Sequence, residues 1–111
     1  MPRPRFTLRW LTVVVGTVAV LIWLGKLCLL RGAHGWRASL EERSAVDYHL
    51  FARRATNNAS VARDPDETAR LLAEADQHSR RMEYHTAMAR KYEHAARYPW
   101  LPVAPDPAEP K

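Results

Sequence analysis

Several features are scarce in this sequence of 111 residues, and each scarcity excludes something. A single cysteine, Cys28, rules out an intramolecular disulfide. The first thirty residues contain no acid, whereas all twelve acidic residues and thirteen of the seventeen Lys and Arg follow them. The net charge of +5 is therefore concentrated near the N-terminus, and the rest of the chain is almost neutral. Without a basic face we expect no nucleic-acid partner.

Motifs of catalysis and metal binding are equally scarce. The serines lie in helix-capping or helical contexts without a nucleophile elbow or glycine-rich loop, and no His-x-x-x-His or Glu-x-x-His spacing occurs. His78 and His85 are two helical turns apart, ~10 Å, which is too far for one helix to hold one small ion with both. We therefore predict no enzyme, no catalytic residue, no metal site and no cofactor. The alternative is a small membrane subunit that binds a metal or haem through its histidines.

The longest apolar run, Leu11–Leu30, contains a single charge, Lys26. As a helix, twenty residues rise ~30 Å, which matches the hydrocarbon core of a bilayer. No A-x-A-like cleavage site follows the run, which favours an uncleaved anchor over a signal peptide. We predict a single-pass transmembrane helix at residues 10–30, with the lipid bilayer as its partner.

The N-terminal stub, residues 1–9, sets the expected orientation. Arg3, Arg5 and Arg9 are unopposed by acids. A short basic flank before an uncleaved anchor usually stays in the cytoplasm. We therefore expect a cytoplasmic N-terminus and a C-terminal region outside.

After the apolar run the sequence predicts a break and then a helical region, residues 39–97. Two glycines within residues 31–38 indicate a juxtamembrane linker. Ser39 and Glu42 have the spacing of a capping box, which predicts a helix over about 40–57. Small residues and one tyrosine recur along one face of it in steps of three and four: Ala45, Tyr48, Ala52, Ala55, Ala59 and Ala62.

A second helix start is the sharpest local signal. Asp64 suits the N-cap and Pro65 the first helical position, and neither proline nor glycine recurs until Pro99, which predicts a helix over about 65–97. Its stripe has a 3.5-residue average spacing, typical of a coiled-coil seam: Leu71, Ala75, His78, Met82, His85, Ala89, Tyr92 and Ala96. The fold class is therefore all-α, a transmembrane helix followed by two amphipathic helices that form a hairpin or a coiled-coil-like homo-oligomer.

The C-terminal residues 98–111 form a proline-rich tail with five prolines. Because proline fixes φ and disfavours helix before it, we expect an extended tail. Its aromatic Trp100 among prolines is typical of a docking segment. We predict partner binding at Pro99, Trp100, Leu101, Pro102 and Val103. The alternative is that Trp100 folds back onto the end of the second helix.

Two resemblances follow from short motifs. The tail and the residues before it contain Tyr84-His85, Lys91-Tyr92, Ala95-Ala96 and Pro99-Trp100-Leu101-Pro102-Val103 followed by Pro105-Asp106-Pro107. In these the chain resembles short, uncharacterised membrane proteins of planctomycete bacteria, which implies an N-terminal anchor but no particular activity. Phe6-Thr7-Leu8 before a valine-rich run also resembles the start of type IV pilins, although Arg5 and Trp10 replace the glycine and glutamate of those proteins.

Taken together, these features predict a membrane-anchored, non-enzymatic helical protein with an interaction or structural role. Its partner would be another protein or a second copy of itself. A degenerate pilin-like subunit is a further alternative.

Overall fold

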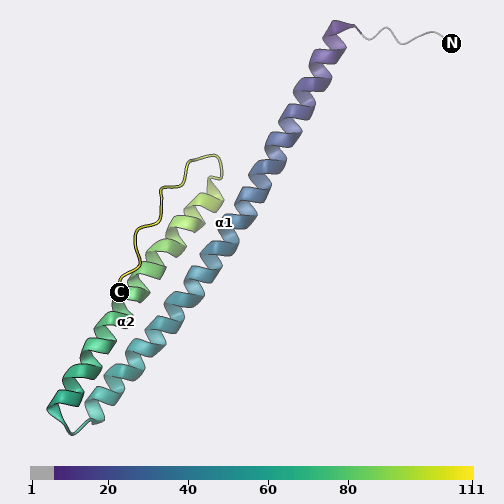
Figure 1. Ribbon diagram of the computed structural model, residues 1–111. Coiled ribbons are helices and arrows are strands. Elements are labelled where there is room, and N and C mark those ends of the chain that lie inside the picture. The colour runs from purple at the N-terminus through teal and green to yellow at the C-terminus, as the bar shows by residue number, and fades with distance from the viewer. Residues whose placement is uncertain (1–6) are drawn as a thin grey trace.

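The computed structural model describes residues 7–111 as two long antiparallel helices and a C-terminal segment that returns along the second (Figure 1). α1 spans Leu8–Val61, and α2 spans Pro65–Arg97. Residues 98–101 form a turn, and residues 102–111 are neither helix nor strand. The all-helical class is confirmed. The predicted stub lies mostly outside the described residues, and its last two residues, Leu8 and Arg9, already belong to α1.

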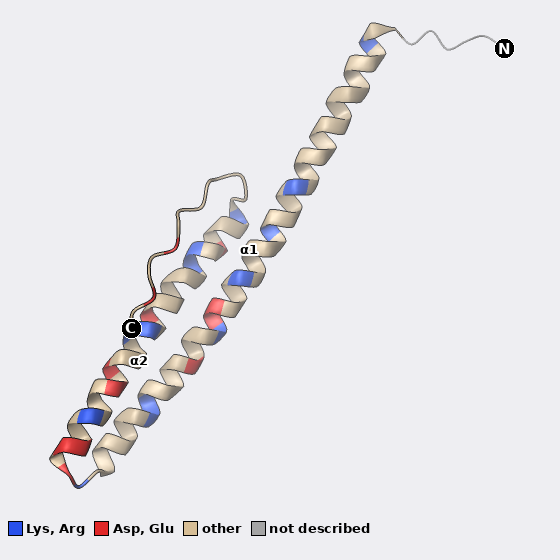
Figure 2. Cartoon of the chain, in the orientation of Figure 1, with Lys and Arg blue, Asp and Glu red and all other residues tan. Residues whose placement is uncertain are grey.

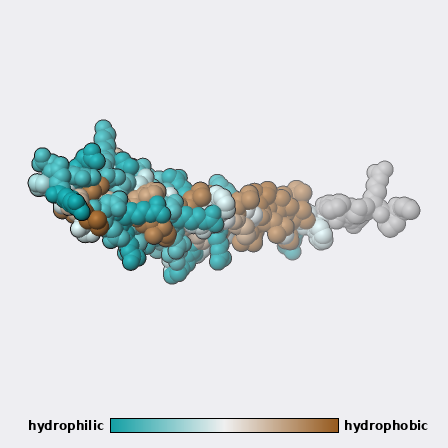
Figure 3. Space-filling model, turned by 90° about the horizontal axis from the view of Figure 1, so that it is seen from below, coloured by the Kyte–Doolittle hydropathy of each residue, from teal (hydrophilic) through white to brown (hydrophobic). Residues whose placement is uncertain are grey.

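α1 is much longer than its partner, and only its second half is packed. Its 54 residues rise ~81 Å, and the molecule is 95 Å long but only 23 by 15 Å across. The first half projects beyond the hairpin as an apolar rod, seen as the brown surface beside the largely hydrophilic hairpin in Figure 3. By length and composition α1 is able to cross a membrane, and none of its most apolar stretch is buried within the molecule.

The predicted linker at residues 31–38 is wrong, because α1 passes through it without a break. Ser39 does not cap a helix; its hydroxyl donates to the Gly35 carbonyl at 3.1 Å within the continuing helix. Glycine costs a helix about 1 kcal/mol relative to alanine, which is a weak penalty rather than a stop. Here His34 stacks on Tyr92 of α2 (ring centroids 6.0 Å apart), and this packing opposes the penalty.

The first amphipathic helix was also predicted to end too early, at about residue 57. It continues to Val61, and Ala55 and Ala59 on either side of the weak helix formers are buried. Tertiary contact therefore overrides local propensity at both places. The described residues contain two helices, not the three that the sequence predicted.

The start and end of α2 agree with the sequence-based prediction. The Asp64 carboxylate accepts a hydrogen bond from the Asp66 amide at 3.1 Å, and Pro65 occupies the first turn. Asp66 and Glu67 stand at the positive end of the helix dipole. The helix ends at Arg97, two residues before Pro99, as expected from the preference of residues before proline for extended conformations.

The interface between α1 and α2 is lined mainly by small side chains. Ala45, Ala55 and Ala59 of α1 and Ala75 of α2 are buried. All eight residues of the predicted stripe on α2 are buried or half-buried, from Leu71 to Ala96. Contacts such as Tyr48 with His78 and His85 place this stripe toward α1 of the same chain. Its use between two copies of the chain stays a prediction.

Candidate functional site

The carboxylate of Asp106 is a main point of attachment of the C-terminal segment to the hairpin. Its oxygens accept hydrogen bonds from Lys91 Nζ at 2.6 Å and from the Tyr92 hydroxyl at 2.7 and 2.8 Å. Arg37 of α1 completes the set through Nη2 at 2.6 Å. One side chain thus joins the segment to both helices, and charge-assisted bonds of this kind are about twice as strong as neutral ones. We call these four residues the tail clamp.

The aromatic ring of Tyr92 is the centre of the clamp. It is buried, the Arg37 guanidinium lies 4.4 Å from its centroid and Lys91 Nζ lies at 5.5 Å. Burial, together with the hydrogen bond to Asp106, raises the pKa of Tyr92 above 10.0. Hydrogen bonds from Lys91 and Tyr92 hold the pKa of Asp106 below 3.8. At neutral pH the pair is therefore a neutral hydroxyl donating to a carboxylate.

A second group of contacts surrounds His85, one of the predicted stripe residues. Its Nδ1 lies 2.5 Å from Glu41 of α1, and its Nε2 lies 3.3 Å from Glu109 of the C-terminal segment. The ring stacks on Tyr48, with centroids 5.2 Å apart. Two further bonds fix the segment: Tyr84 donates to the Pro107 carbonyl at 3.0 Å and Arg81 to the Pro110 carbonyl at 3.4 Å.

The histidines do not converge on one point. His78 Nε2 contacts Glu74 one turn earlier at 3.5 Å, while its Nδ1 is buried without a protein partner. His49 is exposed, and Tyr48 occupies the helix face that meets His78 and His85. Among residues 7–111 no group of three or more His, Cys, Asp or Glu is arranged to hold a metal ion.

The predicted docking residues form a turn at the top of the hairpin. Trp100 is 59 % exposed and meets the Tyr98 ring edge-on at 5.7 Å, while Leu101 and Val103 are also exposed. Pro99 is half-buried and Pro102 exposed. Residues 101–104 line a small hollow together with Lys91, His94 and Ala95. We call residues 98–103 the apical loop.

Sequence reasoning missed the face of α2 that receives the C-terminal segment. Met88 and Ala95 are among the most buried residues, yet neither belongs to the predicted stripe. A signal was present, because Arg81, Tyr84, Met88, Lys91 and Ala95 also recur in steps of three and four. This second stripe is less apolar than the first, and three of its polar side chains bond to the segment, those of Arg81, Tyr84 and Lys91.

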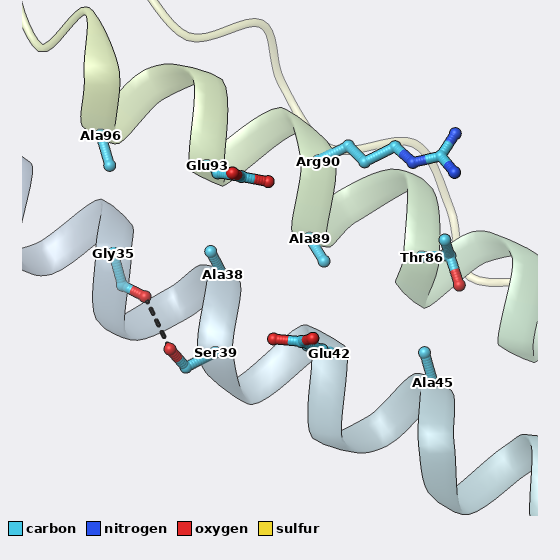
Figure 4. A pocket seen from close by; sticks show the side chains of 10 residues that line it. All are labelled: Gly35, Ala38, Ser39, Glu42, Ala45, Thr86, Ala89, Arg90, Glu93 and Ala96. Atoms are coloured by element: carbon cyan, nitrogen blue, oxygen red, sulfur yellow. Dashed lines mark hydrogen bonds between the residues drawn. The ribbon is translucent and has the colours of Figure 1, made fainter.

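A shallow groove opens on the other flank of the interface between the helices (Figure 4). Its volume is about 460 Å³. Small side chains form its floor, with Glu42, Arg90 and Glu93 at its edges: Gly35, Ala38, Ser39 and Ala45 from α1, and Thr86, Ala89 and Ala96 from α2. A surface this shallow and this poor in convergent polar groups suits packing contacts better than a small molecule.

Comparisons of this chain with protein-family models, with curated proteins and with solved structures found no match.

Proposed function

We propose that this chain is a single-pass membrane protein without enzymatic activity, which carries a rigid helical hairpin at the membrane surface and acts by binding. One observation carries the proposal. An apolar segment, wholly exposed, is continuous with a helix that is packed along the rest of its length. Twenty-odd exposed apolar residues are unstable in water but match the thickness of a bilayer.

The continuity of α1 supports the structural part of this role. Because no linker separates the apolar half from the packed half, the hairpin cannot swing freely relative to the membrane. The tail clamp adds a third layer and fixes the C-terminal segment on the same body. Because the hairpin is already rigid, it loses less conformational entropy when a partner binds to it.

Two surfaces remain for binding. The apical loop exposes Trp100, Leu101 and Val103, and the groove between the helices offers small residues to which a partner helix can come close. Either surface fits a protein partner or a second copy of the chain, the latter in a coiled-coil-like arrangement. We also propose that the chain is related to the planctomycete membrane proteins that it resembles; three residues of that resemblance, Tyr84, Lys91 and Asp106, hold the C-terminal segment here.

The basic N-terminal flank favours a cytoplasmic N-terminus, with the hairpin on the outside. Protease added to sealed cells should then degrade the hairpin. Complete protection there, with cleavage only after the membrane is opened, would reverse the proposed orientation.

Membrane fractionation tests the anchor itself. The full chain should stay in the membrane after alkaline carbonate washing and enter solution only with detergent. Partner binding is tested by purification from native membrane with Trp100→Ala, and Trp36→Ala serves as the matched control because Trp36 is equally exposed, at 64 %. Release of the full chain by carbonate would refute the proposal.

A further inference from the structure

The height of the apical loop relative to the apolar half of α1 is fixed by contacts across the hairpin. His34 stacks on Tyr92, and Gly35 and Ala96 line the same groove. The helices run antiparallel at 1.5 Å per residue, so advancing along α2 means moving back along α1. The loop beyond Arg97 therefore lies level with the end of the apolar run near Leu30, as Figure 1 shows.

The side chains of the loop are those that membrane interfaces favour. Tyr98, Trp100, Leu101 and Val103 are all exposed, although the first three belong to a turn closed by a hydrogen bond from the Leu101 amide to the Tyr98 carbonyl at 3.1 Å. Trp and Tyr concentrate at the headgroup level because their rings are apolar and their polar atoms stay hydrated. Four exposed apolar side chains therefore lie at the level of the bilayer surface, where they can contact lipid.

Charge around the loop has the matching sign. Arg97 is highly exposed and only loosely paired with Glu93, at 3.8 Å. By the same register, Lys26 and Arg31 of α1 lie at about the level of the loop. The upper part of α1 carries basic residues and no acidic ones (Figure 2). No acid occurs in the C-terminal segment before Asp106, whose charge is already paired in the clamp. Basic residues at this level attract anionic lipid headgroups.

The loop is also held in place before any contact is made. His94 packs on Tyr98 with ring centroids 4.9 Å apart, and the clamp fixes the segment a few residues further on. Little conformational entropy is lost when such a loop meets a surface.

We propose that the apical loop enters the headgroup region of the same bilayer that α1 crosses, so that the hairpin touches the membrane at two points. This inference rests on the proposed membrane anchor and names the lipid surface, rather than a protein, as the partner of Trp100. The two contacts together hold the hairpin at a fixed angle to the membrane.

Single-tryptophan chains reconstituted into lipid vesicles test this directly. Three versions of the full chain keep only Trp100, only Trp23 or only Trp36, with Phe at the other tryptophan positions. The vesicles contain phosphatidylcholine, with or without anionic phosphatidylglycerol, and lipid brominated in the upper acyl chain. We expect bromine to quench Trp100 and Trp23 but to spare Trp36, which lies ~9 Å beyond Leu30 along α1. Trp100 should also show a blue shift and a several-fold loss of acrylamide quenching.

The outcomes separate the two proposals. If Trp23 is not quenched, the membrane anchor is wrong. If Trp23 is quenched while Trp100 keeps a water-exposed emission, the anchor stands and the lipid contact is wrong. A Trp100 emission that shifts only when native membrane proteins are added would assign the loop to a protein partner and also overturn the inference. Far-ultraviolet circular dichroism confirms that each version keeps the helices.

Discussion

Residues 8–30 and residues 31–61 belong to the same helix, α1, but they differ in what surrounds them. The first half is exposed, except for the half-buried Leu27 and Leu30 at its end, and carries large apolar side chains. The second half meets α2 along one stripe of small residues and carries both signs of charge on its other faces (Figure 2). One continuous helical backbone thus passes from an exposed stretch into a packed one, and the two stretches differ only in their side chains.

The comparison shows why a helix can run through a boundary that its sequence marks as a joint. An α-helix makes its backbone hydrogen bonds within itself, so α1 continues unbroken from its exposed surroundings into its packed ones. The boundary between the two surroundings therefore requires a change of side chains and no change of fold.

The largest expected effect comes from placing a charge in the first half. Val20 and Val46 are 56 % and 55 % exposed, so they form a matched pair in the two halves. Val20→Arg should cost about 2.5–3.5 kcal/mol of insertion free energy and reduce the membrane-bound fraction, because it lies near the middle of the apolar run. Val46→Arg should change stability by less than about 0.5 kcal/mol. Equal membrane-bound fractions for the two variants would show that the halves do not differ as proposed.

The next effect concerns the packed half. Met82 is half-buried within the stripe on α2, whereas its neighbour Glu83 is exposed. Met82→Asp should destabilise the hairpin by about 2 kcal/mol or more, since it removes apolar contact and partly buries a charge. Glu83→Asp should have almost no effect. Urea unfolding in detergent, followed by circular dichroism, measures both, and similar midpoints would mean that the stripe is not an interface.

A smaller effect is expected at the tail clamp. Asp106→Asn removes the charge that Lys91 and Arg37 share and should loosen residues 98–111 at a cost of about 1–2 kcal/mol. The control is Asp76→Asn, which breaks an exposed pair with Arg80 that is worth about 0.5 kcal/mol. Limited proteolysis of the C-terminal segment reports the difference. Unchanged protection in Asp106→Asn would mean that the clamp does not hold the segment.

The clamp should also respond to pH in a defined direction. The folded chain lowers the pKa of Asp106, so its contribution is present above pH 3.8 and is lost as the pH falls through the lower folded value. The raised pKa of Tyr92 acts at the other end, where stability is present below pH 10.0 and lost as the pH rises through the folded value. Proteolytic protection of the segment should be flat between these limits. Asp106→Asn should remove the acidic transition and weaken the alkaline one, because the Asp106 carboxylate also helps to raise the pKa of Tyr92.

The smallest effect concerns the boundary itself. Gly32 and Gly35 have helical backbones, and an added Cβ would meet nothing within 4 Å at either position. Gly32→Ala with Gly35→Ala should therefore stabilise α1 by about 1 kcal/mol in total or slightly more. Thermal unfolding in detergent measures this. A loss of stability or of partner binding would show that the boundary has to bend.

Some elements followed from local sequence. The apolar run predicted the exposed first half of α1, and Asp64 with Pro65 predicted where α2 begins. The 3.5-residue stripe on α2 predicted the face that packs on α1. Each is a local signal, because a cap or a periodic face is encoded within a few turns of chain.

Other features were decided only by tertiary structure. α1 continues through residues 31–38 because His34 packs on Tyr92, a contact that no glycine count reveals. Asp106 meets Arg37 across 69 positions of sequence, and this contact helps to hold the tail, which was predicted to be extended, on the hairpin as a third layer. Contacts of such separation leave no periodic trace in the sequence, because they depend on where the helices bring distant residues together.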